Sequence, residues 1–221
     1  MPRYRWIITS IWAVVTLVVI VSSLYLCDGR LVYSLDDPYI QLKLADVILG
    51  GGYGINPSEY ASPSSPILYA PMVAATQRLG LGSAGPLALD LIAAGGAVYL
   101  GSLFIEGYVL GGAVTRTTAW FAYPLGVLLI FALSAVALPM TGLEHSWHVL
   151  LLVVILFEFA RMLSTDSEAS PFLIAAIVLS PLIRFEGVAA SFAAILGVGV
   201  ARPLESRFDR GDPHRLCVRG L

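Results

Sequence analysis

The chain has 221 residues, of which 57% are hydrophobic and only 13% are charged, and its mean hydropathy is +0.82. A soluble domain of this length would carry about 25% charged residues. The composition therefore excludes an ordinary soluble domain and predicts an all-α integral membrane protein, with the lipid bilayer as its surroundings. The formal net charge of −2 gives no reason to expect a nucleic-acid partner.

Apolar stretches of the chain predict about six transmembrane helices, at 6–27, 87–110, 119–138, 146–163, 171–183 and 188–201. The first is longer than the apolar core of a cleaved signal peptide, so we expect it to be retained. The last two are short and are separated by Arg184-Phe185-Glu186-Gly187. One helix across both would place two charges near the membrane centre, at roughly 2.5–3.5 kcal/mol each on insertion scales. Two helices that meet at a turn lining a watery cavity cost less, and we expect that pair.

The basic residues divide unequally between the two ends of these predicted spans. The side with both termini has nine of the 13: Arg3, Arg5, Arg116, Arg161, Arg202, Arg207, Arg210, Arg215 and Arg219. The other side has Arg30, Lys43, Arg78 and Arg184. The positive-inside rule therefore predicts a multi-pass plasma-membrane protein with cytoplasmic termini and an extracytoplasmic 28–86 loop. In this topology 1–201 is a transmembrane module, and 202–221 is an arginine-rich cytoplasmic tail that we expect to be disordered.

The extracytoplasmic loop is expected to carry two helices that lie at the membrane interface. The first begins within Ser34-Leu35-Asp36-Asp37-Pro38, because proline suits the first helical turn and an aspartate suits the N-cap before it. The second is the apolar stretch 66–79, which is too short to span a bilayer. A capped interfacial helix with a solvated rim would explain the two aspartates without any chemistry.

Three polar clusters fall on the outer face under this topology. They are the 28–86 loop, the turn Thr141-Gly142-Leu143-Glu144-His145-Ser146-Trp147-His148 and the turn Arg184-Phe185-Glu186-Gly187. Polar groups at membrane depth are costly, so their coincidence on one face indicates a shared site. The alternative is that outer loops are simply polar.

The two histidines of the second cluster allow a metal-binding alternative. His145 and His148 lie three residues apart at a predicted helix start and would share one face of that helix. Asp36 or Glu144 would then complete a site for a divalent cation. Structural zinc sites usually show three or four ligands, so a His-x-x-His pair is a weak signal and the metal stays an open alternative.

Three carboxylates lie inside the predicted spans, near their ends: Asp90, Glu106 and Glu158. Residues so placed are expected to reach the interface or to be paired locally. A small transporter would use them as coupling carboxylates, but such groups are expected near mid-membrane in a chain with repeated halves. The sequence shows no internal repeat, so we rank transport last.

Five short motifs occur along the chain in an order that carries a family resemblance. They are Leu35-Asp36-Asp37-Pro38-Tyr39-Ile40, Gly54-Ile55-Asn56-Pro57, Ser62-Pro63-Ser64-Ser65-Pro66, Thr141-Gly142-Leu143-Glu144 and Arg184-Phe185-Glu186-Gly187. Their order and sidedness resemble those of GT-C fold membrane glycosyltransferases, notably actinobacterial arabinofuranosyltransferases that use polyprenyl-phosphate sugars. The similarity spans roughly residues 5–200, and Phe185 stands where that family commonly has proline. Members of the family are usually longer, so the resemblance implies the N-terminal part of such an enzyme.

The resemblance implies transfer of a sugar from a polyprenyl-phosphate donor to an extracytoplasmic glycan or lipid acceptor. Asp36 is then the general base, and Asp37 orients it, holds a cation or positions the acceptor. Lys43 or Arg184 would neutralise charge on the leaving phosphate. The remaining implied contacts to the sugar, or to the residues around it, are Tyr39, Glu144, His145 and Glu186. The alternative is a non-catalytic assembly subunit or truncated remnant, or a chain that needs a partner subunit.

Overall fold

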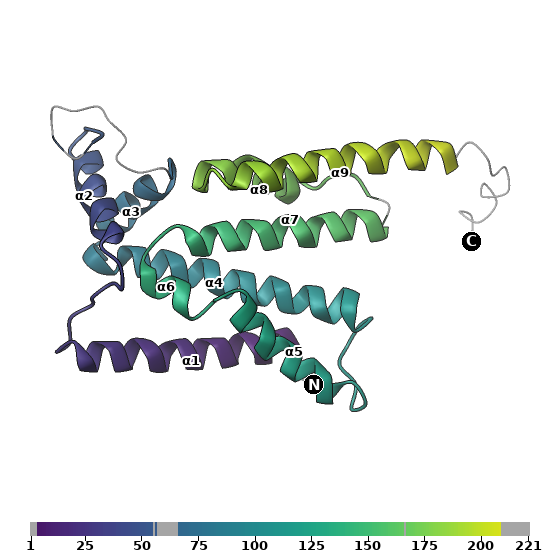
Figure 1. Ribbon diagram of the computed structural model, residues 1–221, viewed down its shortest axis with the longest axis horizontal. Helices are drawn as coiled ribbons and strands as arrows, with labels where there is room; N and C mark the ends of the chain where they lie inside the picture. Colours follow the sequence, from purple (N-terminus) through teal and green to yellow (C-terminus); the bar gives the residue numbers. More distant parts are fainter. Residues whose placement is uncertain (1–3, 55, 57–65, 166, 209–221) are drawn as a thin grey trace.

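The computed structural model describes residues 4–54, 56, 66–165 and 167–208, with side chains to residue 199, and all regular structure among them is helical. In chain order the elements are α1 (Tyr4–Leu26), α2 (Asp37–Leu49), α3 (Tyr69–Arg78), the 3-10 turn η1 (Gly82–Ala84), α4 (Gly85–Phe104), the π-helical turn η2 (Ile105–Val109), α5 (Ala119–Ala132), α6 (Ala137–Thr141), α7 (His145–Thr165), α8 (Pro171–Ile183) and α9 (Gly187–Phe208). In Figure 1 the long helices lie side by side, and α2 and α3 stand at one end of the bundle.

The long helices have the length and composition of membrane spans. Within the described residues, the segments long and apolar enough to cross a membrane are Tyr4–Leu26, Gly82–Val109, Ala119–Thr141 and His145–Thr165. Two shorter apolar helices, Pro171–Ile183 and Gly187–Gly199, follow them. The protein is therefore an all-α membrane protein, and the fold class predicted from composition is confirmed.

Helix α4 packs against both α1 and α7, and its packing faces carry small side chains. The buried positions of α4 include Ala93, Ala94, Ala97, Val98 and Gly101. Small residues let helix backbones approach closely inside a bilayer, where lipid is as apolar as the side chains themselves. One apolar cluster joins α1, α4 and α5, and a second joins α7, α8 and α9. The bundle therefore consists of two packed groups of helices, with α4 and α7 in contact between them.

The pair of helices predicted at 171–201 is confirmed, because α8 and α9 meet at a turn. A Cβ atom at Gly187 would overlap the backbone of Ser180 in α8, so only glycine permits this close approach. Helix α9 continues to Phe208, so residues 202–208 are helical and not the disordered tail that we expected. Helix propagation adds one hydrogen bond per residue, and Arg202, Leu204, Glu205 and Arg207 are good helix formers on either side of Pro203. Residues 209–221 lie outside the described part of the chain.

The span predicted at 119–138 lies within the apolar segment Ala119–Thr141, but the helix is broken inside it, which the sequence did not predict. Helix α5 ends just before Ser134, whose backbone is left-handed with a φ of 48°, and α6 begins three residues later. Pro139 has no N–H to offer the carbonyl of Ala135, four residues earlier, so a regular helix would leave that oxygen without a donor. The indole Nε1 of Trp12 in α1 donates to this oxygen at 2.9 Å. A side chain from another helix therefore replaces the missing backbone donor.

Candidate functional site

Three segments far apart in the sequence meet at one end of the bundle. Figure 1 shows α2 and α3, the turn between α6 and α7, and the turn between α8 and α9 at the same end, whereas α1 begins and α9 ends at the other. The backbone N–H of Leu68, just before α3, donates to the carbonyl of Leu182 near the end of α8 at 3.2 Å. The described residues of the three predicted polar clusters therefore lie at one end of the bundle and form one candidate site.

Tyr33 fixes the segment that leads to the two aspartates. Its hydroxyl donates to the carbonyl of Ser83 at 2.7 Å and accepts from the N–H of Leu87, in the first turn of α4, at 3.1 Å. Burial raises the pKa of Tyr33 to about 12, so the hydroxyl keeps its proton. Gly142 has a φ of +67°, and a Cβ there would lie 2.5 Å from the Tyr33 ring. The tyrosine therefore joins the start of α2, the start of α4 and the turn after α6.

The start of α2 exposes the residues that the sequence assigns to catalysis. Asp36 is the N-cap residue and Asp37 is the first helical residue, followed by Pro38 in the first turn. The side chains of Asp36, Asp37 and Lys43 are exposed and make no hydrogen bond or ion pair with any described residue. The ring of Tyr39 packs edge-on against Tyr33 at 5.9 Å between centroids, and its hydroxyl accepts from the backbone N–H of Tyr33 at 3.3 Å.

Arg184 is the centre of a charged cluster with Glu144, His145 and Glu186, here called the Arg184 cluster. Its Nη1 donates to Oε1 of Glu144 at 2.8 Å and lies 2.8 Å from Nε2 of His145. Its Nε and Nη2 donate to the two carboxylate oxygens of Glu186 at 3.2 and 2.8 Å, which is a bidentate contact. The side chain of Glu144 is 7% exposed, that of Arg184 is 23% exposed and that of Glu186 is 65% exposed. The guanidinium therefore has one buried carboxylate partner and one that faces outward.

The charges of the cluster act strongly on one another. Hydrogen bonding to Glu186 is the largest cause that raises the pKa of Arg184, and the same bonds lower the pKa of Glu186 to about 2. Because a guanidinium only donates hydrogen bonds, the His145 nitrogen that it contacts must accept. The Asp37 carboxylate lies within electrostatic range of the His145 ring. The start of α2 therefore lies near enough to His145 for Asp37 to act weakly on its charge.

A pair of fully buried polar side chains lies near Glu144. Tyr69 of α3 donates to Oδ2 of Asp90 in α4 at 3.2 Å. Burial raises the pKa of Tyr69 well above its ordinary value, so the phenol stays a donor. Glu144 lies within electrostatic range of both residues. The local pairing expected for Asp90 is confirmed, and it ties α3 to α4 beside the start of α7.

Five buried polar atoms of α4, α7 and α8 near this end of the bundle have no hydrogen-bond partner in the described part of the chain. They are Asp90 Oδ1, Ser146 Oγ, Trp147 Nε1, His148 Nδ1 and Ser180 Oγ. His148 also lies within electrostatic range of Arg184 and Glu186. Buried polar atoms in folded proteins usually have a partner. This end of the bundle therefore has hydrogen-bonding capacity that its own side chains do not use.

The alternative metal site does not assemble among the residues that the structure describes. No three histidine, cysteine, aspartate or glutamate side chains gather there in a way that could hold a metal ion. The His145 ring contacts Arg184 instead. We therefore assign no step to a metal.

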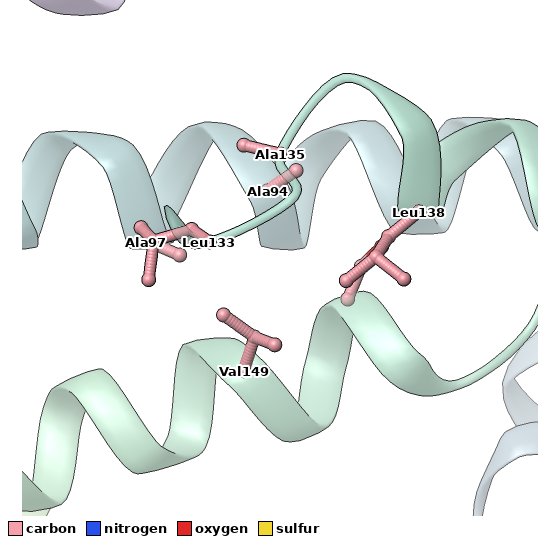
Figure 2. Close-up of a pocket in the computed structure, with 7 residues that line it drawn as sticks. Ala94, Ala97, Leu133, Ala135, Leu138 and Val149 are labelled. Carbon is pink, nitrogen blue, oxygen red and sulfur yellow. The ribbon is translucent and has the colours of Figure 1, made fainter. Parts of the chain in front are cut away.

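An apolar crevice too narrow to admit a water molecule lies between α4, the break after α5 and α7. Figure 2 shows Ala94, Ala97, Leu133, Ala135, Leu138 and Val149 around it. Ser146 contributes the one polar side chain of its lining. No residue of the Arg184 cluster lines the crevice, so it offers no charged group to a ligand.

The sequence did not single out Tyr33 or Tyr69, although both build the site. Their contacts join residues 50 and 21 positions apart, and no motif or periodic pattern marks either tyrosine. Comparisons with protein-family models, curated proteins and solved structures give no match. A function for this site therefore has to be argued from its residues and geometry, together with the motif resemblance.

Proposed function

We propose that this chain transfers a sugar from a polyprenyl-phosphate donor to a glycan or lipid acceptor of the cell envelope, as part of a GT-C-type glycosyltransferase. The observation that carries this proposal is the meeting of the acidic pair and the Arg184 cluster at one end of the bundle. Asp37 lies within electrostatic range of His145, which contacts Arg184. An exposed carboxylate and a fixed cation at the same end of the bundle are the two groups that glycosyl transfer from a lipid phosphate needs.

In the proposed reaction Asp36 takes the proton of the acceptor hydroxyl while that oxygen attacks the anomeric carbon of the donor. The bond from the anomeric carbon to the phosphate oxygen breaks, and the polyprenyl phosphate leaves with the electron pair. The exposed side chain of Asp36 is open to an acceptor. Asp37, one residue further on, positions that acceptor.

Arg184 is the better placed of the two cations to neutralise the leaving phosphate. Its guanidinium is held by Glu144 and His145 at the end of the bundle, whereas Lys43 is exposed on α2. A cation that is fixed before the reaction needs no reorganisation when charge develops on the leaving group. Glu144 and His145 hold Arg184 in place, and the sugar ring lies between this cation and Asp36.

A transfer assay with membranes that contain the full chain tests the proposal. The membranes are incubated with a polyprenyl phosphate carrying a labelled sugar, and label is followed into larger acceptors. Loss of a general base typically costs about 10²–10⁴-fold in rate, so Asp36→Asn should reduce transfer by about 10²-fold or more. Asp46→Asn is the matched control, because Asp46 is also an exposed carboxylate of α2.

Two outcomes would contradict the proposal. Equal transfer by the Asp36→Asn variant and the unmodified chain would remove the assigned base. A chain that binds polyprenyl phosphate and transfers no sugar, alone or with a co-expressed partner subunit, would instead be a non-catalytic assembly subunit.

The proposed extracytoplasmic position of the site has its own test. In a chain with Cys27→Ser and Cys217→Ser, single cysteines are introduced as Ser83→Cys beside α4 and as Thr117→Cys between η2 and α5. Both positions are exposed. Ser83 precedes the span predicted at 87–110 and Thr117 precedes the one predicted at 119–138, so the predicted topology places them on opposite sides of the membrane. A membrane-impermeant maleimide should label Ser83→Cys on intact cells and Thr117→Cys only after permeabilisation. The reverse pattern would place the Arg184 cluster in the cytoplasm.

A further inference from the structure

The two carboxylate partners of Arg184 differ in how easily they can be replaced. Glu144 is buried, and its Oε1 takes one hydrogen of Nη1. Glu186 is mostly exposed and covers the other edge of the guanidinium, formed by Nε and Nη2. Removing a buried partner leaves an uncompensated charge, whereas an exposed ion pair contributes little and exchanges readily with solvent. The edge under Glu186 is therefore the edge that a ligand can reach.

The geometry of that edge is suited to a phosphate. Two parallel N–H donors of a guanidinium match a carboxylate and a phosphate equally well, which is why arginine binds both in a bidentate manner. Glu186 also immediately precedes Gly187, where α9 begins. The first N–H groups of α9 donate to backbone carbonyls of the turn, so this helix adds only its dipole to the local preference for an anion. His148 lies within electrostatic range of the same two groups and has a buried ring nitrogen, Nδ1, without a partner among the described residues.

The surroundings of the edge indicate an anion that carries an apolar chain. Phe185 is 62% exposed and Val188 is 55% exposed, and they flank Glu186 in the sequence. The turn also connects two apolar helices, α8 and the first part of α9. A free inorganic anion gains nothing from exposed apolar side chains, whereas the first units of a lipid tail can cover them.

We propose that Glu186 is a resident counter-ion of Arg184, which the phosphate of an incoming lipid headgroup displaces while Glu144 and His145 hold the guanidinium in place. This inference rests on the proposed function, because the lipid phosphate is that of the donor. It gives Glu186 a different role from the sugar contact that the resemblance implies. The carboxylate turns outward when the lipid binds and returns to Arg184 when the lipid leaves.

Equilibrium binding to the full chain in a neutral maltoside detergent tests the exchange. The probes are a radiolabelled polyprenyl phosphate, the corresponding polyprenol without phosphate, and inorganic phosphate as competitor. Glu186→Gln removes the competing charge and should tighten polyprenyl-phosphate binding by up to about fivefold, the size expected for an exposed ion pair. Arg184→Lys keeps the charge but loses the bidentate edge, and Arg184→Gln loses both, so both should weaken binding, the latter by about tenfold or more.

Glu158→Gln is the matched control for Glu186→Gln. Glu158 also accepts two hydrogen bonds from one arginine, Arg161, but it does so at the opposite end of the bundle. The Glu158→Gln variant should leave the affinity for polyprenyl phosphate unchanged. The polyprenol should bind much more weakly than the phosphate, and inorganic phosphate should compete poorly.

Each other result overturns a defined part of the inference. If Glu186→Gln binds no more tightly while both Arg184 variants bind more weakly, the exchange is wrong and the phosphate role of Arg184 in the proposed function stands. If the Arg184 variants bind as the unmodified chain does, both the exchange and that role are wrong, although Asp36 can still pass its transfer test. If inorganic phosphate displaces the labelled lipid with an affinity equal to that of the lipid itself, the ligand is a free anion.

Discussion

The two ends of the bundle hold their charged residues in different ways. At the end where α1 begins, Arg5 contacts Glu106 at 3.4 Å, and Arg161 contacts Glu158 at 2.8 Å, three residues earlier in the same helix. The local pairing expected for these two glutamates is confirmed. At the other end, Arg184 contacts Glu144 from a turn 40 residues earlier, as well as His145 and Glu186.

This difference separates charges that serve the fold from charges that can serve a ligand. Where each arginine has a single carboxylate partner, the pair neutralises itself and the helix end is stable in the interface. Where one arginine contacts three groups of unequal burial, its buried partner fixes its position and its exposed partner can be exchanged. Asp36 and Asp37, without partners in the described residues, lie at this second end only.

The largest expected difference between the two ends concerns their arginines. Arg184→Gln leaves Glu144 buried without a charged partner and should lower the free energy of unfolding by about 3 kcal/mol. Arg161→Gln should lower it by at most about 1 kcal/mol, because the Arg161 side chain is 40% exposed. Unfolding in mixed micelles of increasing dodecyl sulfate content measures both. The added change Glu144→Gln should restore part of the loss in Arg184→Gln, and equal losses at the two ends would contradict the comparison.

A second contrast uses one glycine from each end. Gly142 has a positive φ and faces the Tyr33 ring, so Gly142→Ala should cost about 2 kcal/mol of unfolding free energy and should lower transfer activity as well. Gly107 in η2 has open space around it and an ordinary φ, so Gly107→Ala should change stability by less than about 0.5 kcal/mol. The same micelle titration measures both variants. A neutral Gly142→Ala would show that Tyr33 does not fix the turn before Glu144.

Between the two ends, the break after α5 is stabilised by the indole of Trp12. Trp12→Phe removes the donor to the carbonyl of Ala135 and should cost about 1–3 kcal/mol of unfolding free energy, the typical penalty for an unsatisfied buried acceptor. Trp6→Phe is the control in the same helix, since Trp6 is 55% exposed and its ring contacts that of Tyr99. If the two variants lose the same stability, the indole does not support the break after α5.

The apolar spans and the turn at Arg184 could be predicted from the sequence because each depends on local physics. A run of apolar residues long enough to cross a bilayer is visible in any window of that length. The free-energy cost of placing two charges at mid-membrane can also be estimated from the local sequence. It correctly predicted that α8 and α9 are separate helices that meet at Arg184 and Glu186. The break near Ser134 could not be predicted, because it depends on Trp12, whose indole donates to the Ala135 carbonyl in place of the N–H that Pro139 lacks. That donor lies 123 residues from Ala135.

The candidate site shows the same limit. Glu144, His145, Arg184 and Glu186 stood out because polar residues are rare in such a chain, and they do meet. Tyr39 and Lys43 were chosen for their positions on the first interfacial helix, but side-chain direction depends on how that helix packs. Tyr39 packs on Tyr33, and Lys43 is exposed. Burial of Asp90 against Tyr69 likewise follows from the packing of α3 on α4, which no local pattern encodes.

The smallest expected effect is a titration, and it tests the exposed partner of Arg184 directly. The bidentate contact lowers the pKa of the Glu186 carboxyl from 4.5 to about 2, with His148 as a further cause. Because the folded-state pKa is the lower one, the contribution of the ion pair to stability is complete above pH 4.5 and is lost as the pH falls through about 2, where the carboxylate itself takes up its proton. Carbon NMR of labelled glutamate in micelles should therefore show the Glu186 carboxylate still ionised at pH 4. Its signal is the one that disappears in the Glu186→Gln variant.

Arg184→Lys gives the contrast for this titration, because it keeps one positive charge and removes the bidentate edge. The Glu186 carboxyl should then titrate closer to its ordinary value of 4.5. Saturation of the unmodified chain with polyprenyl phosphate should produce the same upward change, since the displaced carboxylate has lost its contact with the guanidinium. A Glu186 titration that the lipid does not move, in a chain that binds the lipid, would mean that the phosphate binds without replacing the carboxylate.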